Sequence, residues 1–197
     1  GDGEVRPSLA RFMQSSVPVF AAVGTIEPRK NYPFLLRTFE KLWLQGVPAH
    51  LLIAGRATAE EREFAARLRH HPEQGRRLLT LLDASDHELA HVYAHARALL
   101  FPSLAEGFGL PLVEARTHGC RVIANDLPVF RELADDGVSL CAGNSIDSMG
   151  SLIASHSGAA PQTFVAPMPA FTWEDSARQC LDVIAALLTP KAQSKHG

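Results

Sequence analysis

Short apolar segments alternate along the chain with longer segments whose apolar residues recur every three to four positions. The first pattern is typical of buried strands and the second of amphipathic helices. The predicted strands are 17–23, 50–54, 78–82, 98–101, 121–124 and 138–141, and the predicted helices are 32–44, 58–69, 86–96, 111–118, 146–154 and 171–188. Such alternation predicts an α/β fold, a Rossmann-like three-layer arrangement with a mainly parallel sheet of about six strands between two layers of helices.

Local composition divides the chain into segments. Residues 17–154 are expected to form the α/β domain, and residues 1–16, which show no clear period, read as a linker or the remnant of a preceding segment. Residues 155–170 are rich in Ser, Pro, Gly and Ala and indicate an irregular linker. Residues 171–190 are predicted to form a final helix that packs on the same domain, with Trp173 as a candidate core anchor.

Several predicted helices begin at residues whose side chains can accept a hydrogen bond from the first turn. The predicted N-caps are Asn31, Ser85 or Asp86, Ser145, and Thr172 with an acidic residue three positions later.

The composition restricts the class of function. The 197 residues carry a formal net charge of −2 and no block of basic residues, so no nucleic-acid partner is expected. No apolar run reaches the length of a transmembrane helix. Cys120, Cys141 and Cys180 are odd in number and widely spaced, which favours buried or semi-buried thiols in a reducing compartment over a disulfide framework or a metal knuckle. The cytoplasm is therefore the expected location.

The loop between the fourth predicted strand and the next helix carries the clearest candidate chemistry. Gly107 and Gly109 allow the backbone to approach a ligand closely, and the helix that follows presents free N–H groups and the positive end of its dipole. Glu106 and Glu114 lie on either side of this anion site. An anion site flanked by hydrogen-bond acceptors suits a ligand with both phosphates and hydroxyls, such as a nucleotide sugar.

A second loop, Gly24–Asn31, leads from the first strand into a helix and contains Arg29 and Lys30. Two cations beside a helix N-terminus would hold a diphosphate by charge-assisted hydrogen bonds, although a solvated basic turn has the same sequence. In parallel α/β sheets ligands bind beyond the carboxyl ends of the strands. This rule brings the loop together with 82–86 and 102–110.

The string Pro102-Ser-Leu-Ala-Glu-Gly-Phe-Gly-Leu-Pro-Leu-Val-Glu-Ala115 resembles the E-x7-E signature of retaining glycosyltransferases of family 4, which have the GT-B fold. The string Gly24-Thr-Ile-Glu-Pro-Arg-Lys-Asn31 is similar to the phosphate-binding segment of a mannosyltransferase-like branch. The resemblance covers roughly residues 17–188. It corresponds to the C-terminal, donor-binding half of such an enzyme.

The resemblance implies roles for the charged residues. Lys30 would contact the donor phosphates and stabilise the departing diphosphate, Glu106 would orient the sugar, and Glu114 would accept from ribose hydroxyls. Many relatives have an arginine where this chain has Thr25. Arg29 is the candidate for that second charge, which makes Lys30, Glu106 and Arg29 the predicted catalytic residues.

The remaining predicted donor-binding residues are mostly backbone contacts. The resemblance implies that N–H groups of the glycine loop face phosphate or sugar oxygens and that the third predicted strand ends near the base. Many relatives have glycine in place of Asp83, and Gly55 and Arg56 either border the donor or form a surface turn. The predicted contacts are Gly24, Thr25, Leu82, Asp83, Gly107, Phe108, Gly109 and Leu110.

His87, His91 and His95 recur every four residues on one predicted helix, as in some metal sites. Apolar residues occupy the opposite side of that helix, which favours a solvated polar stripe. The chain has no Asp-x-Asp motif for a metal-held diphosphate. Lys30 and helix dipoles would neutralise the phosphates instead, so we expect catalysis without a metal or other cofactor.

The resemblance implies transfer of a hexose, with mannose as a candidate, from a GDP- or UDP-type nucleotide sugar to an acceptor hydroxyl with retention at the anomeric carbon. The acceptor would be a glycan or lipid-linked glycan of polysaccharide biosynthesis, bound through an N-terminal domain that 197 residues cannot include. This chain alone is expected to be inactive. The sequence leaves open whether the full-length protein associates peripherally with the cytoplasmic face of the inner membrane.

Two alternatives remain at this point. One is half of a nucleotide-sugar epimerase with the same architecture, and the other is a non-catalytic binding module that kept the fold. Loss of nucleotide binding on changing Lys30, Glu106 or Glu114 would separate a working site from a relic.

Overall fold

The computed structural model describes residues 3–158 and 172–188. Its centre is a six-stranded, entirely parallel sheet with the strand order β3-β2-β1-β4-β5-β6, which confirms the predicted Rossmann-like α/β class. The strands are β1 (Val19–Val23), β2 (His50–Ala54), β3 (Leu78–Leu81), β4 (Ala98–Phe101), β5 (Val122–Asn125) and β6 (Val138–Cys141).

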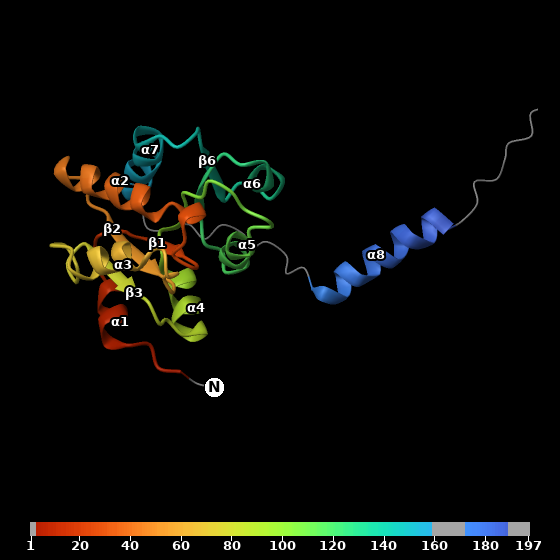
Figure 1. Ribbon diagram of the computed structural model, residues 1–197, viewed down its shortest axis with the longest axis horizontal. Coiled ribbons are helices and arrows are strands. Elements are labelled where there is room, and N and C mark those ends of the chain that lie inside the picture. Colours follow the sequence, from red (N-terminus) through yellow and green to blue (C-terminus); the bar gives the residue numbers. More distant parts are fainter. Residues whose placement is uncertain (1–2, 159–171, 189–197) are drawn as a thin grey trace, which may run out of the picture.

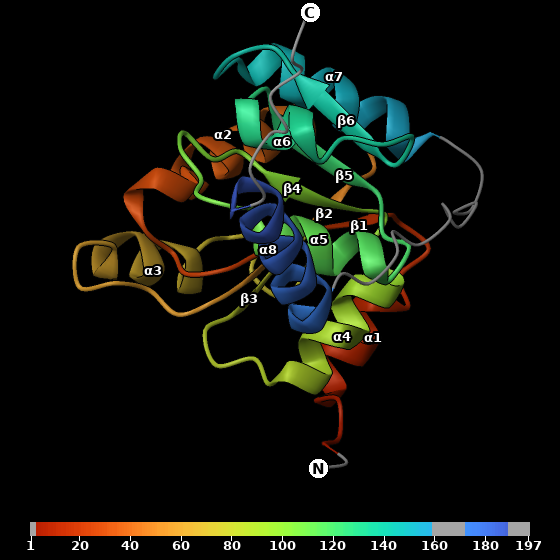
Figure 2. The same ribbon diagram turned by 90° about the vertical axis from the view of Figure 1, so that its right-hand side faces the viewer.

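Helices cover both faces of this sheet (Figure 1, Figure 2). Because both faces are covered, the strands are continuous apolar runs rather than alternating ones, and every residue of β1, β4 and β5 is buried. One face packs against α2 (Tyr32–Leu44), α3 (Arg62–Arg69) and α7 (Ile146–Ser157), and the other against α1 (Pro7–Met13), α4 (Asp86–His95), α5 (Leu110–Thr117) and α6 (Pro128–Glu132).

The strand order reverses beside β1, which pairs with β2 on one side and β4 on the other. The loops that follow β1 and β4 therefore leave the same edge of the sheet and diverge, which opens a crevice at that edge. The predicted loops 24–31 and 102–110 are these two connections.

The elements that differ from the prediction are short. Residues 1–16 were expected to be a linker or the remnant of a preceding segment; α1 forms within them and buries Leu9, Phe12 and Met13 against the sheet, as a linker would not. Its seven residues span too few turns to show a helical period. The helix α6 was not predicted, for the same reason, and α3 begins at Arg62 rather than at residue 58. Of the predicted linker 155–170, residues to Ser157 continue α7, and 159–170 lie outside the described residues.

The helix starts show which predicted caps form. Ser85 and Glu88 make a reciprocal capping box, Ser145 accepts from the amide of Ser148, and Thr172 exchanges hydrogen bonds with the acidic residue at 175. Asn31 occupies the predicted N-cap position of α2, but its side chain makes no capping hydrogen bond. Its backbone is left-handed at φ 56°, and its side chain donates to distant acceptors instead of capping α2.

The final helix α8 (Trp173–Leu188) confirms the predicted helix but not a core role for its apolar side chains. Trp173 is 91% exposed and Leu187 80% exposed. The packing of this helix on the domain stays a prediction. No helix of the described residues is long and apolar enough to cross a membrane.

Two of the three thiols are buried as predicted, and Cys180 on α8 is exposed. Burial raises the pKa of Cys120 to about 12 and that of Cys141 to about 11. Both buried thiols are therefore protonated and unreactive at neutral pH.

A buried arginine holds α5, the helix that follows the glycine-containing loop 102–110, in place. Arg116 of α5 is fully buried, and its guanidinium donates to both carboxylate oxygens of Asp135 and to the carbonyl of Cys120. A Cβ on Gly137 would lie 2.4 Å from that guanidinium, so a larger residue there would displace Arg116. The hydrogen bonds from Arg116 lower the pKa of Asp135, which keeps this partner ionised at neutral pH.

We predict that Asp135→Ala destabilises the domain by about 2 kcal/mol, because the buried arginine loses a charged partner. Asp136→Ala is the matched control, since it removes the exposed neighbouring carboxylate. Urea unfolding at neutral pH measures both variants, and equal midpoints for the two would contradict this role of Asp135.

Candidate active site

A cleft of about 650 Å³ opens at the carboxyl ends of β1 and β4. The sequence predicted that the loops after these strands would meet, and the structure brings them together. The lining residues are Gly24, Thr25, Glu27, Arg29, Lys30, Ala105, Glu106, Gly107, Phe108, Gly109, Leu110, Pro111 and Glu114. All three predicted catalytic residues are among them.

A buried ion pair lies at the centre of the cleft. The Nζ of Lys30 is 2.6 Å from Oε1 of Glu106, and the side chains are 7% and 5% exposed. Ser103 donates from Oγ to the same carboxylate oxygen at 2.7 Å. Arg29 donates from Nη1 to the other oxygen, Oε2, also at 2.7 Å. Both oxygens of Glu106 are therefore held, and the residue is not a solvated loop carboxylate.

Burial alone would raise the pKa of Glu106, but hydrogen bonds from Lys30 and Ser103 and the nearby positive charges outweigh it, so the pKa is lowered. Glu106 is therefore ionised at neutral pH. Arg29 also contacts Glu27 at 2.6 Å, so the two cations of the cluster are balanced by two carboxylates. Arg29 is 45% exposed, whereas Lys30 is buried. An entering anion can therefore draw the exposed side chain of Arg29 away from its carboxylate partners, whereas the side chain of Lys30 is already fixed in the cleft.

The backbone of the two loops fixes this geometry. Lys30 ends a short 3₁₀ helix, Pro28–Lys30, and the amide of Leu104 donates to the carbonyl of Arg29 at 2.8 Å. Beneath the second loop, the buried side chain of Asn125 donates to the carbonyls of Pro102 and Ser103. Asn31 also donates to the carbonyl of Pro102, at 3.3 Å.

Sequence reasoning missed Ser103 and Asn125. Asn125 is the last residue of β5, and a polar residue there, at the carboxyl edge of a buried strand, was the available signal. Ser103 lies within the string 102–115, but its contact with Glu106 could be seen only in the structure.

The N-terminus of α5 forms one wall of the cleft. Gly109 precedes the helix at φ 80°, a left-handed conformation that favours glycine. Pro111 has no N–H, and the amide of Leu112 donates to the carbonyl of Gly109, so the N–H groups of Gly109 and Leu110 are the ones at the positive end of the helix dipole that no turn of α5 can satisfy. Phe108 and Leu110 are more than half exposed and form an apolar rim. Glu114 lies one turn into the helix, with one oxygen held by the hydroxyl of Tyr93.

A second hollow of about 200 Å³ adjoins the cleft and shares Gly24 and Thr25 with it. Leu82 and Asp83 line it, as do Gly55 and Arg56, which therefore border the candidate donor site. A Cβ on Gly55 would lie 1.8 Å from the carbonyl oxygen of Gly24, so this crossing of two loops requires glycine.

The carboxylate of Asp83 also contacts a residue that does not line this hollow. It accepts from Nη1 of Arg6 at 2.8 Å, and the same guanidinium binds the buried Glu88. Hydrogen bonds from Arg6 lower the pKa of Glu88 to about 2. Residues before the first strand thus help to hold the loop where the sequence predicted base contacts.

The histidines of α4 do not form a metal centre. The rings of His91 and His95 are 4.1 Å apart, and burial together with the neighbouring imidazoles lowers the pKa of His91. Within the described residues there is no group of three His, Cys, Asp or Glu side chains that could hold a metal ion.

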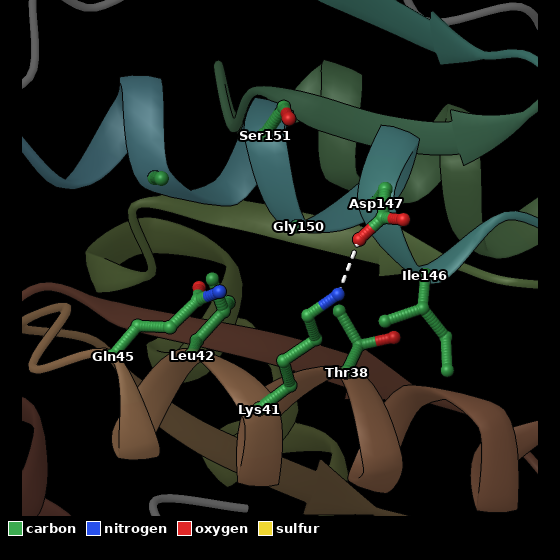
Figure 3. A pocket seen from close by; sticks show the side chains of 9 residues that line it. Thr38, Lys41, Leu42, Gln45, Ile146, Asp147, Gly150 and Ser151 are labelled. Carbon is green, nitrogen blue, oxygen red and sulfur yellow. Dashed lines mark hydrogen bonds and ion pairs between the residues drawn. The ribbon is translucent and has the colours of Figure 1, made fainter.

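A separate hollow of about 150 Å³ lies between α2 and α7 and has no lining residue in common with the cleft (Figure 3). Lys41 and Asp147 face each other across it as an ion pair. The amine of Lys41 is half exposed, in contrast to the buried amine of Lys30. This hollow supplies a matched control for the candidate active site.

The parallel sheet and its flanking helices define a Rossmann-like domain of the type found in GT-B glycosyltransferases. Residues 11–156 match the family described as "Glycosyl transferases group 1". The chain therefore belongs to this family.

Curated relatives include mannosyltransferases. The chain is 43% identical to the serotype-specific mannosyltransferase WbdA of Escherichia coli over 122 residues, 62% of this chain and 15% of that protein. It is 26% identical to O-antigen chain mannosyltransferase B of Escherichia coli over 190 residues. That match covers 93% of this chain but only 50% of the relative. The chain thus spans half or less of these two proteins.

Solved structures share the fold at low sequence identity. The catalytic domain of starch synthase IV from Arabidopsis thaliana gives a TM-score of 0.70 at 15% identity, covering 91% of this chain and 42% of that chain. The C-terminal domain of the group 1 glycosyl transferase LpcC from Francisella tularensis gives 0.60 at 19% identity, covering 76% and 80%.

We predict that Glu106→Gln destabilises the domain by about 2 kcal/mol at neutral pH, because the buried amine of Lys30 loses its charged partner. The folded pKa of Glu106 is below its ordinary value of 4.5, so this stabilisation is present above that pH and is lost as the pH falls through the folded pKa. Unfolding free energies measured from pH 7 to pH 3 should therefore fall less steeply for Glu106→Gln than for the unaltered chain. The exposed Glu132→Gln serves as control, and a slope for Glu106→Gln equal to that of the unaltered chain would show that Glu106 is not held as described.

Proposed function

We propose that this chain is the donor-binding half of a retaining glycosyltransferase that transfers a hexose, with mannose as the candidate, from a nucleoside diphosphate sugar to an acceptor hydroxyl. The observation that carries the proposal is the buried Lys30–Glu106 pair beside the N-terminus of α5. Family membership and the mannosyltransferase relatives support the reaction class.

The diphosphate of the donor lies between Lys30 and the first turn of α5. The amine supplies a fixed positive charge, and the N–H groups of Phe108, Gly109 and Leu110 supply donors along the helix dipole. Arg29, which is half exposed, leaves Glu27 to add a second cation when the phosphates enter. Lys30, Arg29 and the N–H groups at the start of α5 thereby neutralise the diphosphate without a metal ion.

During transfer, the bond between the anomeric carbon and the phosphate oxygen breaks, and both electrons stay with the diphosphate. Lys30 stabilises the charge that develops there, which lowers the barrier more than it stabilises the bound donor. The acceptor oxygen bonds to the same face of the anomeric carbon, and its proton passes to the departing phosphate oxygen. Glu106, ionised and held at both oxygens, orients the sugar hydroxyls.

The nucleoside lies at the other end of the cleft. Glu114 accepts from a ribose hydroxyl, and the base, guanine or uracil, enters the hollow lined by Leu82 and Asp83. Gly24 and Thr25 line both spaces and therefore lie between the base and the phosphates. In this proposed order the sugar lies near the Lys30–Glu106 pair.

The acceptor site belongs to a further domain. The chain matches 50% of the length of mannosyltransferase B, and its fold is similar to a structure described as a C-terminal domain. An N-terminal domain of the whole enzyme would bind a glycan or lipid-linked glycan at the cytoplasmic face of the inner membrane and close the cleft to water. The chain alone therefore binds the donor weakly and turns it over poorly.

We predict that calorimetric titration of the chain with GDP, UDP and ADP detects one preferred nucleotide. Lys30→Ala should weaken that binding at least tenfold, because a charge-assisted hydrogen bond to phosphate is lost. Glu114→Ala should weaken it several-fold through the ribose. Lys41→Ala, the control in the separate hollow between α2 and α7, should leave the dissociation constant unchanged.

Absence of binding at millimolar concentration by the chain and by a longer protein that contains it would overturn the proposal. Binding that is equally strong in Lys30→Ala and in the unaltered chain would place the nucleotide elsewhere. Nucleotide binding by the longer protein without hexosyl transfer would indicate a non-catalytic binding module.

A further inference from the structure

Tyr93 of α4 does not line the candidate active site, but it contacts one of the residues that do. Tyr93 is 4% exposed, and its hydroxyl donates to Oε2 of Glu114 at 2.8 Å. Its ring lies 5.4 Å from that of His118, which follows α5. Burial and the charge of Glu114 raise the pKa of Tyr93, so the phenol stays protonated and remains a donor throughout the physiological pH range.

Glu114 itself is exposed, at the edge of the cleft. An exposed glutamate samples several rotamers, and ordering it when a ligand binds costs conformational entropy. The contact from Tyr93 fixes one oxygen before any ligand arrives. No donor in the described part of the chain contacts the other oxygen, Oε1, which therefore remains available to a ligand hydroxyl.

We propose that Tyr93 is the positioning residue for the nucleoside end of the site: it holds Glu114 so that Oε1 accepts from a ribose hydroxyl. Tyr93 is buried and does not line the cleft, so it acts through Glu114 rather than on the ligand. This inference rests on the proposed function, because it requires a ribonucleotide in the cleft.

The geometry predicts a specific chemical dependence. A residue that only stabilises the fold would weaken every ligand of the cleft alike. A residue that orients Glu114 affects only ligands with ribose hydroxyls. Pyrophosphate, which reaches Lys30 and α5 but has no ribose, should bind equally to the chain with and without the tyrosine hydroxyl.

The experiment compares Tyr93→Phe with the unaltered chain, using the nucleoside diphosphate that binds and its 2′,3′-dideoxy counterpart. We expect the unaltered chain to bind the dideoxy compound about tenfold more weakly than the ribonucleotide. In Tyr93→Phe this ratio should fall to about threefold or less, through weaker binding of the ribonucleotide, with the pyrophosphate dissociation constant unchanged. Tyr32→Phe is the control, because Tyr32 is also buried but donates to the carbonyl of Gly24, and it should keep the full ratio.

Glu114→Asp is a second variant, since it keeps the charge but withdraws the carboxylate from Tyr93. In this variant too, the ratio between the dideoxy compound and the ribonucleotide should fall to about threefold or less. If the unaltered chain binds and Tyr93→Phe keeps the full tenfold ratio, the positioning role is wrong and the proposed function stands. If the chain binds no nucleotide, the same comparison is made in the longer protein that contains it, and absence of binding there as well would overturn both the proposed function and the role of Tyr93.

Discussion

A buried ion pair between Lys30 and Glu106 is the constraint on which the candidate site depends. It joins loops that follow different strands, and its side chains are less than a tenth exposed. Burying two charges costs several kcal/mol per ion unless hydrogen bonds satisfy them. Ser103 and Arg29 supply those hydrogen bonds to Glu106, and the contacts from Arg29 and Lys30 tie the two loops together.

The fold supports that arrangement from below. Placing β1 beside β4 brings the two loops to one edge of the sheet, and the buried amide of Asn125 holds the carbonyls from which the second loop departs. The buried Arg116 fixes α5, whose N-terminus completes the candidate anion site. The helix dipole and Lys30 thus act on one space, because packing and hydrogen bonds far from any ligand hold both in place.

The sequence predicts most of this fold and part of the site. Continuous apolar runs and long amphipathic periods give all six strands and helices such as Tyr32–Leu44, and the strings 24–31 and 102–115 locate Lys30, Glu106 and Glu114. What it could not predict depends on contacts between distant residues. Asn31 is a residue type that often caps helices, yet its side-chain amide donates to a carbonyl 71 residues away. Nothing local to Tyr93 distinguishes it from a core aromatic residue, since its partner is on another helix.

We propose that the buried pair and the α5 N-terminus form a prepared site for a diphosphate. Titration of the ¹⁵N-labelled chain with pyrophosphate, followed by amide chemical shifts, tests this most directly. We expect saturable shifts at Lys30 and at the amides of Phe108 to Leu110, with none around Lys41 and Asp147 in the hollow between α2 and α7. Shifts confined to other surfaces, or none at millimolar pyrophosphate, would contradict it.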